Sequence, residues 1–201
     1  MLARDLASPD GVVEWDRSLA KLNTAQRVIR ANIRNNIRRH LPQLCAYQPN
    51  NERIAIVGGG WSLKYTETEL RDLVFSGVKI VALNGAAEWL VERNFKPSVH
   101  IVLDARPINA GFFKYDVPGC KYFLASQCHS SVFDAVAGRD ATIFHVISTT
   151  NETERRRLDE YYGKGRWQDV PSSGTVGIVA ILLCRLLGFQ FQHLFGIDSC
   201  C

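Results

Sequence analysis

The sequence predicts an α/β fold in which helices cover both faces of a mostly parallel sheet. From Glu52 onward, short apolar runs alternate with helical stretches, and this alternation is typical of a parallel sheet with right-handed crossovers. Most runs are apolar almost throughout, as expected for strands buried on both faces. Strands are expected at 53–57, 79–83, 99–103, 121–125, 141–147 and 192–197. Helices are expected near 66–76, 86–94, 130–137, 152–162 and 175–187.

A helical extension and a linker are expected over residues 1–50, ahead of a sheet domain over 51–201. A narrow apolar stripe recurs every four residues in the extension, at Ile29, Ile33, Ile37 and Leu41. Arginines recur at a similar spacing on a neighbouring face. We favour an amphipathic helix docked through its stripe, with the arginines in solvent. The alternative is a basic helix that contacts a membrane, a partner or a ligand phosphate.

The composition fits one globular domain with a substantial core, because 46% of the 201 residues are hydrophobic. The net charge of +4 suits an anionic small molecule but is too small to predict a specific nucleic-acid partner. The six cysteines include no CxxC pair, which indicates a reduced, cytoplasmic protein. The longest apolar run, at residues 176–187, contains Arg185 and is too short to span a membrane.

The glycine loop Gly58–Gly60 follows the first predicted strand and precedes Trp61 and Ser62. Glycines let the backbone approach a ligand closely, and the next helix would point free N–H groups at the same place, which favours a phosphate. The alternative is a tight turn that binds nothing. Leu63 stands where the dinucleotide fingerprint needs a third glycine, and Asn84 stands where it needs an acid. A dinucleotide is therefore not expected, and the P-loop pattern is also absent.

Polar side chains at the ends of other strands are expected to lie at the same edge of the sheet. Asn84 follows the second strand, Asp104 the third and Asp198 the last. The two carboxylates could hold a Mg²⁺ ion that bridges phosphates, or bond a ribose hydroxyl; capping of the next turn is the alternative. His129 begins a helix after a strand and is the candidate acid or base.

A second helix start lies at Ser173, Gly174 and Thr175, just before a helix that is apolar nearly all round. Its free N–H groups could bind an anion opposite the glycine loop. Ordinary capping by Ser172 or Ser173 is equally compatible with the residues.

Three segments together resemble the MptE-like (motility accessory factor) family. They are IAIVGGGWSL, VALNGAAEWLVERNFKPSVHIVLDARP and SSGTVGIVAILLCRLLGFQFQHLFGIDS, within residues 52–199. The chain departs from the family pattern at Trp61, where proline is usual, and this change leaves the glycines and Ser62 intact while adding a possible stacking surface. The chain ends at Cys201, directly after a predicted functional strand end, so we expect an incomplete domain whose open sheet edge favours a homo-oligomer.

The resemblance implies a Rossmann-like nucleotide-binding transferase that moves diphosphate from ATP to a hydroxymethyl-pterin-like acceptor with Mg²⁺. The GGG-x-S and Gly-Ile-Asp elements are also similar to bacterial sialyltransferases, so a glycosyltransferase that uses a CMP-activated sialic or nonulosonic acid is an alternative. A non-catalytic nucleotide-binding or phage accessory module is another. The residues implied to bind nucleotide phosphate, line the site or close it are Gly58, Gly59, Gly60, Ser62, Asn84, Asp104, Ser173, Gly174 and Asp198.

Overall fold

All six predicted strands are present and form one sheet in the computed structural model, which describes residues 24–147, 152–171 and 175–198. The sheet order is β5-β4-β3-β2-β1-β6, and every neighbouring pair is parallel. The strands are β1 (Asn50–Val57), β2 (Lys79–Leu83), β3 (Val99–Val102), β4 (Lys121–Ala125), β5 (Ala141–Phe144) and β6 (Phe189–Phe195).

The predicted helices are also present, with ends that differ from the expectation by a few residues. They are α1 (Gln26–Asn36), α2 (Glu67–Phe75), α3 (Ala86–Glu92), α4 (Ser130–Asp134), α5 (Glu152–Tyr162) and α6 (Val176–Leu186). The 3₁₀ helix η2 (Ile37–Arg39) lies within the expected helical extension. Two further 3₁₀ helices were not predicted: η3 (Trp61–Tyr65) and η4 (Pro107–Phe113). None of the described helices is long and apolar enough to cross a membrane.

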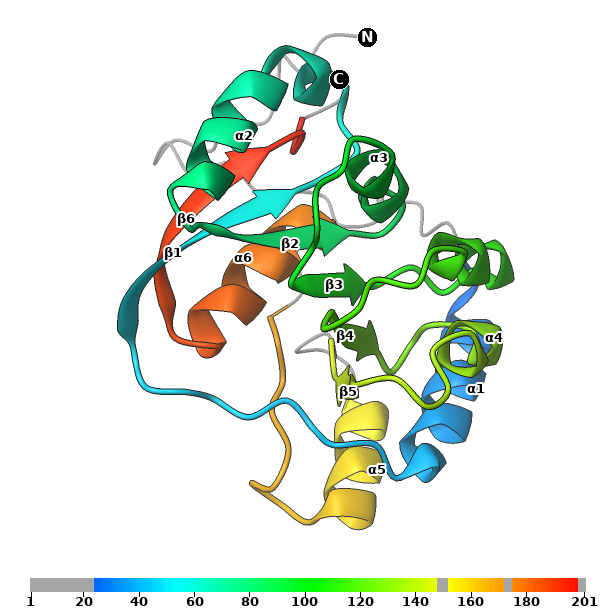
Figure 1. Ribbon diagram of the computed structural model, residues 1–201. Helices are drawn as coiled ribbons and strands as arrows, with labels where there is room; N and C mark the ends of the chain where they lie inside the picture. The colour runs from blue at the N-terminus through cyan, green and yellow to red at the C-terminus, as the bar shows by residue number, and fades with distance from the viewer. Residues whose placement is uncertain (1–23, 148–151, 172–174, 199–201) are drawn as a thin grey trace, which may run out of the picture.

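Helices cover both faces of the sheet (Figure 1). In β1, Ile54 and Ile56 belong to the core cluster that includes α6, whereas Ala55 and Val57 belong to the cluster that includes α2 and α3. Successive side chains of a strand point to opposite faces, so this division means that β1 is covered on both sides. The three-layer, Rossmann-like α/β prediction is therefore confirmed, and the sheet is parallel throughout.

The strand order reverses beside β1. The chain adds β2, β3, β4 and β5 on one side of β1 and then returns through α6 to place β6 on the other side. In open α/β sheets, ligands bind outside the carboxyl ends of the strands near such a reversal. The ends of β1 and its neighbours are therefore where a site is expected.

The N-terminal helix α1 is docked on the sheet domain beside α4, where Figure 1 shows it in blue. Ile33 and Ile37 are 2% and 4% exposed and pack in a cluster with Ile147 and Leu158. The arginines at 27, 30, 34 and 38 are exposed. This arrangement agrees with the favoured interpretation for the described part of the helix.

The segment expected to be a linker runs along the edge of the sheet. Ile143 of β5 donates its N–H to the Pro42 carbonyl at 2.8 Å, and Leu44 donates its N–H to the Ile143 carbonyl at 2.9 Å. Leu44 is buried in the main core. The proposed division between residues 1–50 and 51–201 stays a prediction, but the two parts are in contact.

Asn36 connects α1 to the loop that follows β4. Its buried side-chain amide donates to the carbonyls of Ser126 at 3.0 Å and Cys128 at 2.7 Å.

We expect Asn36→Ala to lower the free energy of unfolding by about 1–3 kcal/mol, because two buried carbonyls lose their donor. The matched control is Asn35→Ala at the exposed neighbouring position, which should change it by less than about 0.5 kcal/mol. Equal losses in the two variants, measured by urea denaturation, would contradict this role of Asn36.

The side chain of His145 is buried beside two aromatic rings. Its ring lies 5.4 Å from the Tyr162 ring and 5.7 Å from the Trp167 ring, between centroids. Neither ring nitrogen has a hydrogen-bond partner in the part of the chain that the structure describes. Burial lowers the pKa of His145 to about 4, so the folded protein holds this side chain neutral.

The free energy of unfolding should therefore fall as the pH falls from about 6.5 to about 4, because the unfolded chain takes up a proton there that folded His145 does not. The contribution of His145 over this range is at most about 3 kcal/mol. His145→Leu should lose less stability than the wild type between pH 7 and pH 4.5, as measured by urea denaturation at each pH. An unchanged pH dependence would contradict the assignment.

Candidate functional site

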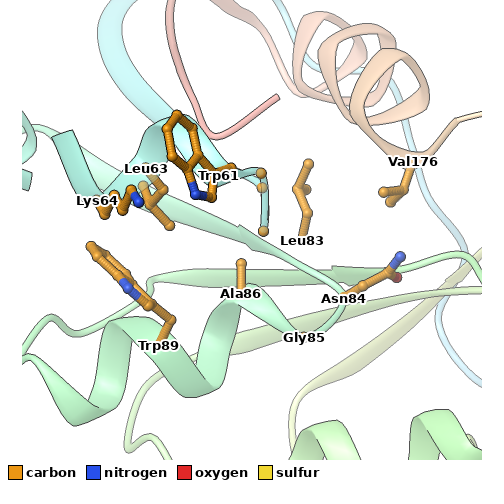
Figure 2. A pocket seen from close by; sticks show the side chains of 12 residues that line it. Trp61, Leu63, Lys64, Leu83, Asn84, Gly85, Ala86, Trp89 and Val176 are labelled. Carbon is orange, nitrogen blue, oxygen red and sulfur yellow. The ribbon is translucent and has the colours of Figure 1, made fainter. Parts of the chain in front are cut away.

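A cavity of about 540 Å³ lies at the carboxyl ends of β1 and β2, next to the reversal in strand order (Figure 2). Its volume falls within the range of small-molecule sites, about 300–1,000 Å³. Glycine backbone, two tryptophans, a lysine, an asparagine and small apolar side chains form its wall. The lining residues are Gly58, Gly59, Gly60, Trp61, Leu63, Lys64, Leu83, Asn84, Gly85, Ala86, Trp89 and Val176.

The glycine loop is held against the end of β6 by its own backbone. Gly58 donates its N–H to the Phe195 carbonyl, and Gly60 donates its N–H to the Gly196 carbonyl, each at 2.8 Å. A Cβ atom on Gly58 would lie only 2.5 Å from the Gly196 oxygen. The contact therefore explains why Gly58 is glycine, and it engages two of the three N–H groups of the loop.

Gly59 differs from its two neighbours. A Cβ atom there would meet no atom within 4 Å, and its N–H makes no hydrogen bond to the described residues. Internal packing therefore gives no reason for glycine at this position. Of the three loop amides, the Gly59 N–H is the one that the described residues leave without a hydrogen-bond acceptor.

Asp198 occupies the start of η3, where an anion was expected. Its carboxylate accepts the Ser62 N–H at 2.8 Å and the Ser62 hydroxyl at 2.5 Å. These hydrogen bonds lower the pKa of Asp198, so the group stays ionised. While this contact is formed, the Ser62 hydroxyl is not free to donate to a phosphate. Ser62 and Asp198 are thus brought together, as partners of each other.

Asn84 lies at the end of the cavity away from the tryptophans (Figure 2). Its φ of 44° is left-handed, a conformation that asparagine adopts more readily than most residues. Its side-chain oxygen accepts the Leu103 N–H at 3.2 Å, and its carbonyl bonds the His100 ring at 2.7 Å. Burial lowers the pKa of His100 to about 4, so the neutral ring donates here. Asn84 therefore joins the ends of β2 and β3 as well as lining the cavity.

Asp104 and His129 lie outside the cavity wall. Asp104 follows β3 and forms an ion pair with Arg106 at 2.5 Å. Partial burial raises the pKa of Asp104, but hydrogen bonds from Arg106 and Asn109 and the Arg106 charge outweigh this effect, and the net shift is downward. His129 is the N-cap of α4, where its ring accepts the Ser131 N–H at 3.2 Å. The structure gives His129 a capping contact and does not bring it to the glycine loop.

The two carboxylates do not fit one shared Mg²⁺ ion. Asp104 follows β3 and Asp198 follows β6, with β2 and β1 between these strands. Three strand spacings amount to about 14 Å, whereas Mg²⁺ binds oxygen at about 2.1 Å. No group of three or more His, Cys, Asp or Glu side chains suited to a metal occurs among residues 24–147, 152–171 and 175–198.

The second helix start reaches the cavity through Val176, the first residue of α6. Thr175 is its N-cap, with the side-chain oxygen accepting the Ile178 N–H at 3.5 Å. The cap is thus Thr175, whereas a serine was expected. Ser172, Ser173 and Gly174 lie outside the described residues, so their predicted roles stay predictions.

The lysine and the second tryptophan of the wall were not singled out from the sequence. Lys64 lies in η3 with its Nζ 3.8 Å from the centre of the Trp61 ring and 4.8 Å from the Tyr65 ring. Trp89 comes from α3 and lies at the same end of the cavity as Lys64 (Figure 2). The three-residue spacing of Trp61 and Lys64 was visible in the sequence, but the approach of Trp89 depends on how α3 packs.

Comparison with known proteins identifies the family. The sequence model described as 6-hydroxymethylpterin diphosphokinase MptE-like matches residues 27–201. The chain belongs to the MptE-like family. This membership supports a transferase-type function. No curated protein matches the chain.

A solved structure of the MAf glycosyltransferase from Magnetospirillum magneticum AMB-1 has a similar fold, with a TM-score of 0.65 and 16% sequence identity. The similarity covers 85% of this MptE-like chain and 27% of the glycosyltransferase chain. At this identity the similarity concerns the fold alone. It is consistent with the family assignment and with the Rossmann-like arrangement.

The glycine loop can be tested by stability alone. Gly58→Ala should lower the free energy of unfolding by about 1–3 kcal/mol, because the new methyl group collides with the Gly196 backbone. Gly59→Ala, the matched control, should leave it within about 0.5 kcal/mol, because its methyl group enters open space. Thermal and urea denaturation of both variants would measure the difference. A larger loss in Gly59→Ala would contradict this packing.

Proposed function

We propose that this chain is a nucleotide-dependent transferase that moves diphosphate from ATP to a hydroxymethyl-pterin-like acceptor. The observation that carries the proposal is the match of the MptE-like diphosphokinase family over residues 27–201. The position of the cavity supports it, because nucleotides bind at the carboxyl edge of such sheets. The volume of about 540 Å³ is sufficient for a nucleotide.

The reaction needs positioning and charge neutralisation more than covalent help from the protein. The acceptor hydroxyl oxygen attacks the β-phosphorus, the bond from that phosphorus to the oxygen on the α-phosphate breaks, AMP leaves and the hydroxyl proton is released. The Gly59 N–H and the Lys64 ammonium, both at the cavity, are donors that could stabilise charge on the phosphates. The apolar side chains of Leu83 and Ala86 would limit access of water.

A glycosyltransferase that uses a CMP-activated sialic or nonulosonic acid is the second candidate. Two observations favour it. The solved structure with a similar fold, over 85% of this chain, is a glycosyltransferase. In addition, Asp104 and Asp198 end strands that are three spacings apart, and transfer of a sugar from CMP does not require a shared metal ion.

Isothermal titration calorimetry with ATP and CMP, each with and without Mg²⁺, separates the candidates. ATP binding that depends on Mg²⁺, together with AMP release in the presence of 6-hydroxymethylpterin, would support the diphosphokinase. Metal-independent binding of CMP would support the glycosyltransferase. Nucleotide binding with neither reaction would favour a non-catalytic nucleotide-binding module. Binding of neither nucleotide would overturn both enzymatic candidates.

Gly59→Asp provides the matched variant for this experiment. A carboxylate at Gly59 has space in the folded protein but would repel a phosphate near the loop. We expect nucleotide binding to weaken at least about tenfold, the equivalent of about 1.4 kcal/mol, while the thermal unfolding temperature stays close to that of the wild type. Unchanged affinity in Gly59→Asp would show that the phosphate does not lie at this loop.

A further inference from the structure

Trp61 stands at the rim of the cavity and is 70% exposed. Its ring is not isolated, because neighbours one turn away in η3 contact it. Tyr65 meets it edge to face, with ring centroids 4.8 Å apart, and the Lys64 ammonium lies 3.8 Å from its centre. The exposed indole is thus supported in place, as a binding platform should be.

Trp89 contributes a second aromatic ring to the wall of the same cavity. Its ring stacks on Phe95, with centroids 6.2 Å apart, and the Arg93 guanidinium lies 4.4 Å from its centre. Figure 2 shows Trp61, Lys64 and Trp89 at one end of the cavity, with Asn84 and Val176 at the other. The two tryptophans come from elements that follow different strands, so the fold itself brings them to one cavity.

Lys64 is the one charged side chain among the described residues that line this cavity. The remaining side chains of the wall are apolar, aromatic or amide, and no carboxylate lines it. A planar ring that carries a negative group satisfies both features, because aromatic side chains stack on rings and the ammonium pairs with an anion. A phosphate alone would pair with the ammonium but would make no ring contact with the two indoles.

We propose that Trp61 and Trp89 hold the base of the nucleotide, and that Lys64 pairs with its phosphate. These residues then set the preference of the site for nucleotides over phosphates that lack a ring. The inference rests on the proposed function, because it takes a nucleotide as the ligand. It adds which side chains recognise the base and which one carries the charge.

The test compares two ligands by calorimetry: the nucleotide that the wild type binds, ATP or CMP, and inorganic triphosphate. Trp61→Ala should weaken nucleotide binding between about fivefold and about a hundredfold, as the loss of a base stack predicts, and leave triphosphate binding unchanged. Trp61→Phe should recover most of the affinity. Lys64→Gln should weaken both ligands and reduce the salt dependence of binding.

Two matched controls lie away from the cavity. Phe75→Ala removes an aromatic side chain that is 83% exposed on α2, and Lys96→Gln removes the charge of an exposed lysine before β3. Both should bind the nucleotide as the wild type does, with unchanged unfolding temperatures. A loss of affinity in these controls as large as in the cavity variants would overturn the assignment.

The outcomes separate this inference from the function on which it rests. Wild-type nucleotide binding that is equally tight in Trp61→Ala and Trp89→Ala would overturn the stacking and leave the proposed function standing. If Trp61→Ala weakens 6-hydroxymethylpterin binding but not nucleotide binding, the platform holds the acceptor, and the inference is overturned. If the wild type binds no nucleotide, both fall together.

Discussion

The contact between the glycine loop and the end of β6 is the constraint on which the candidate site depends. Gly58 and Gly196 approach so closely that a Cβ atom on either would lie 2.5 Å from the carbonyl oxygen of the other. Hydrogen bonds from Gly58 and Gly60 to the end of β6 complete the contact. Because β1 and β6 flank the reversal in strand order, this backbone contact closes the crevice between them at the level of the loop.

Asp198 extends that closure. Its carboxylate accepts two hydrogen bonds from Ser62 and so satisfies the start of η3, which would otherwise attract an external anion. The open space lies on the other side of β1, over β2, where Leu83, Asn84 and Ala86 form part of the wall. The cavity is therefore displaced from the reversal itself by about one strand. The charged side chain of the cavity wall is Lys64, which lies in η3, the element whose start is bound by Asp198.

The rest of the carboxyl edge is occupied by α1 and the loops it contacts. Asn32 donates to the Ala105 and Gln127 carbonyls, and Asn36 donates to the carbonyls on either side of Gln127. These bonds hold the ends of β3 and β4, the half of the edge that carries Asp104 and His129. The polar residues at the strand ends therefore divide into two groups. One lines the cavity or the adjacent turn, and the other takes part in structural contacts.

Periodicity in the sequence was sufficient for the architecture. All six strands and the α-helices of the sheet domain were predictable, because apolar runs and the turn residues between them depend on local backbone preference and burial, which are properties of a few consecutive residues. The glycine loop and the family resemblance were visible for the same reason. The roles of individual polar residues were not, because a serine or an aspartate after a strand has the same local sequence whether it binds a ligand or another part of the chain.

Tertiary structure alone decided which of these residues meet. Ser62 and Asp198 are 136 positions apart and bond each other, whereas Asp104 and Asp198 belong to strands that the sheet order keeps three spacings apart. The packing of α3 also places Trp89 in the cavity that Trp61 and Lys64 line. The sequence by itself determined the fold and a loop of three glycines. The packing of β6 against that loop determined that Gly59 is the member left open to a ligand.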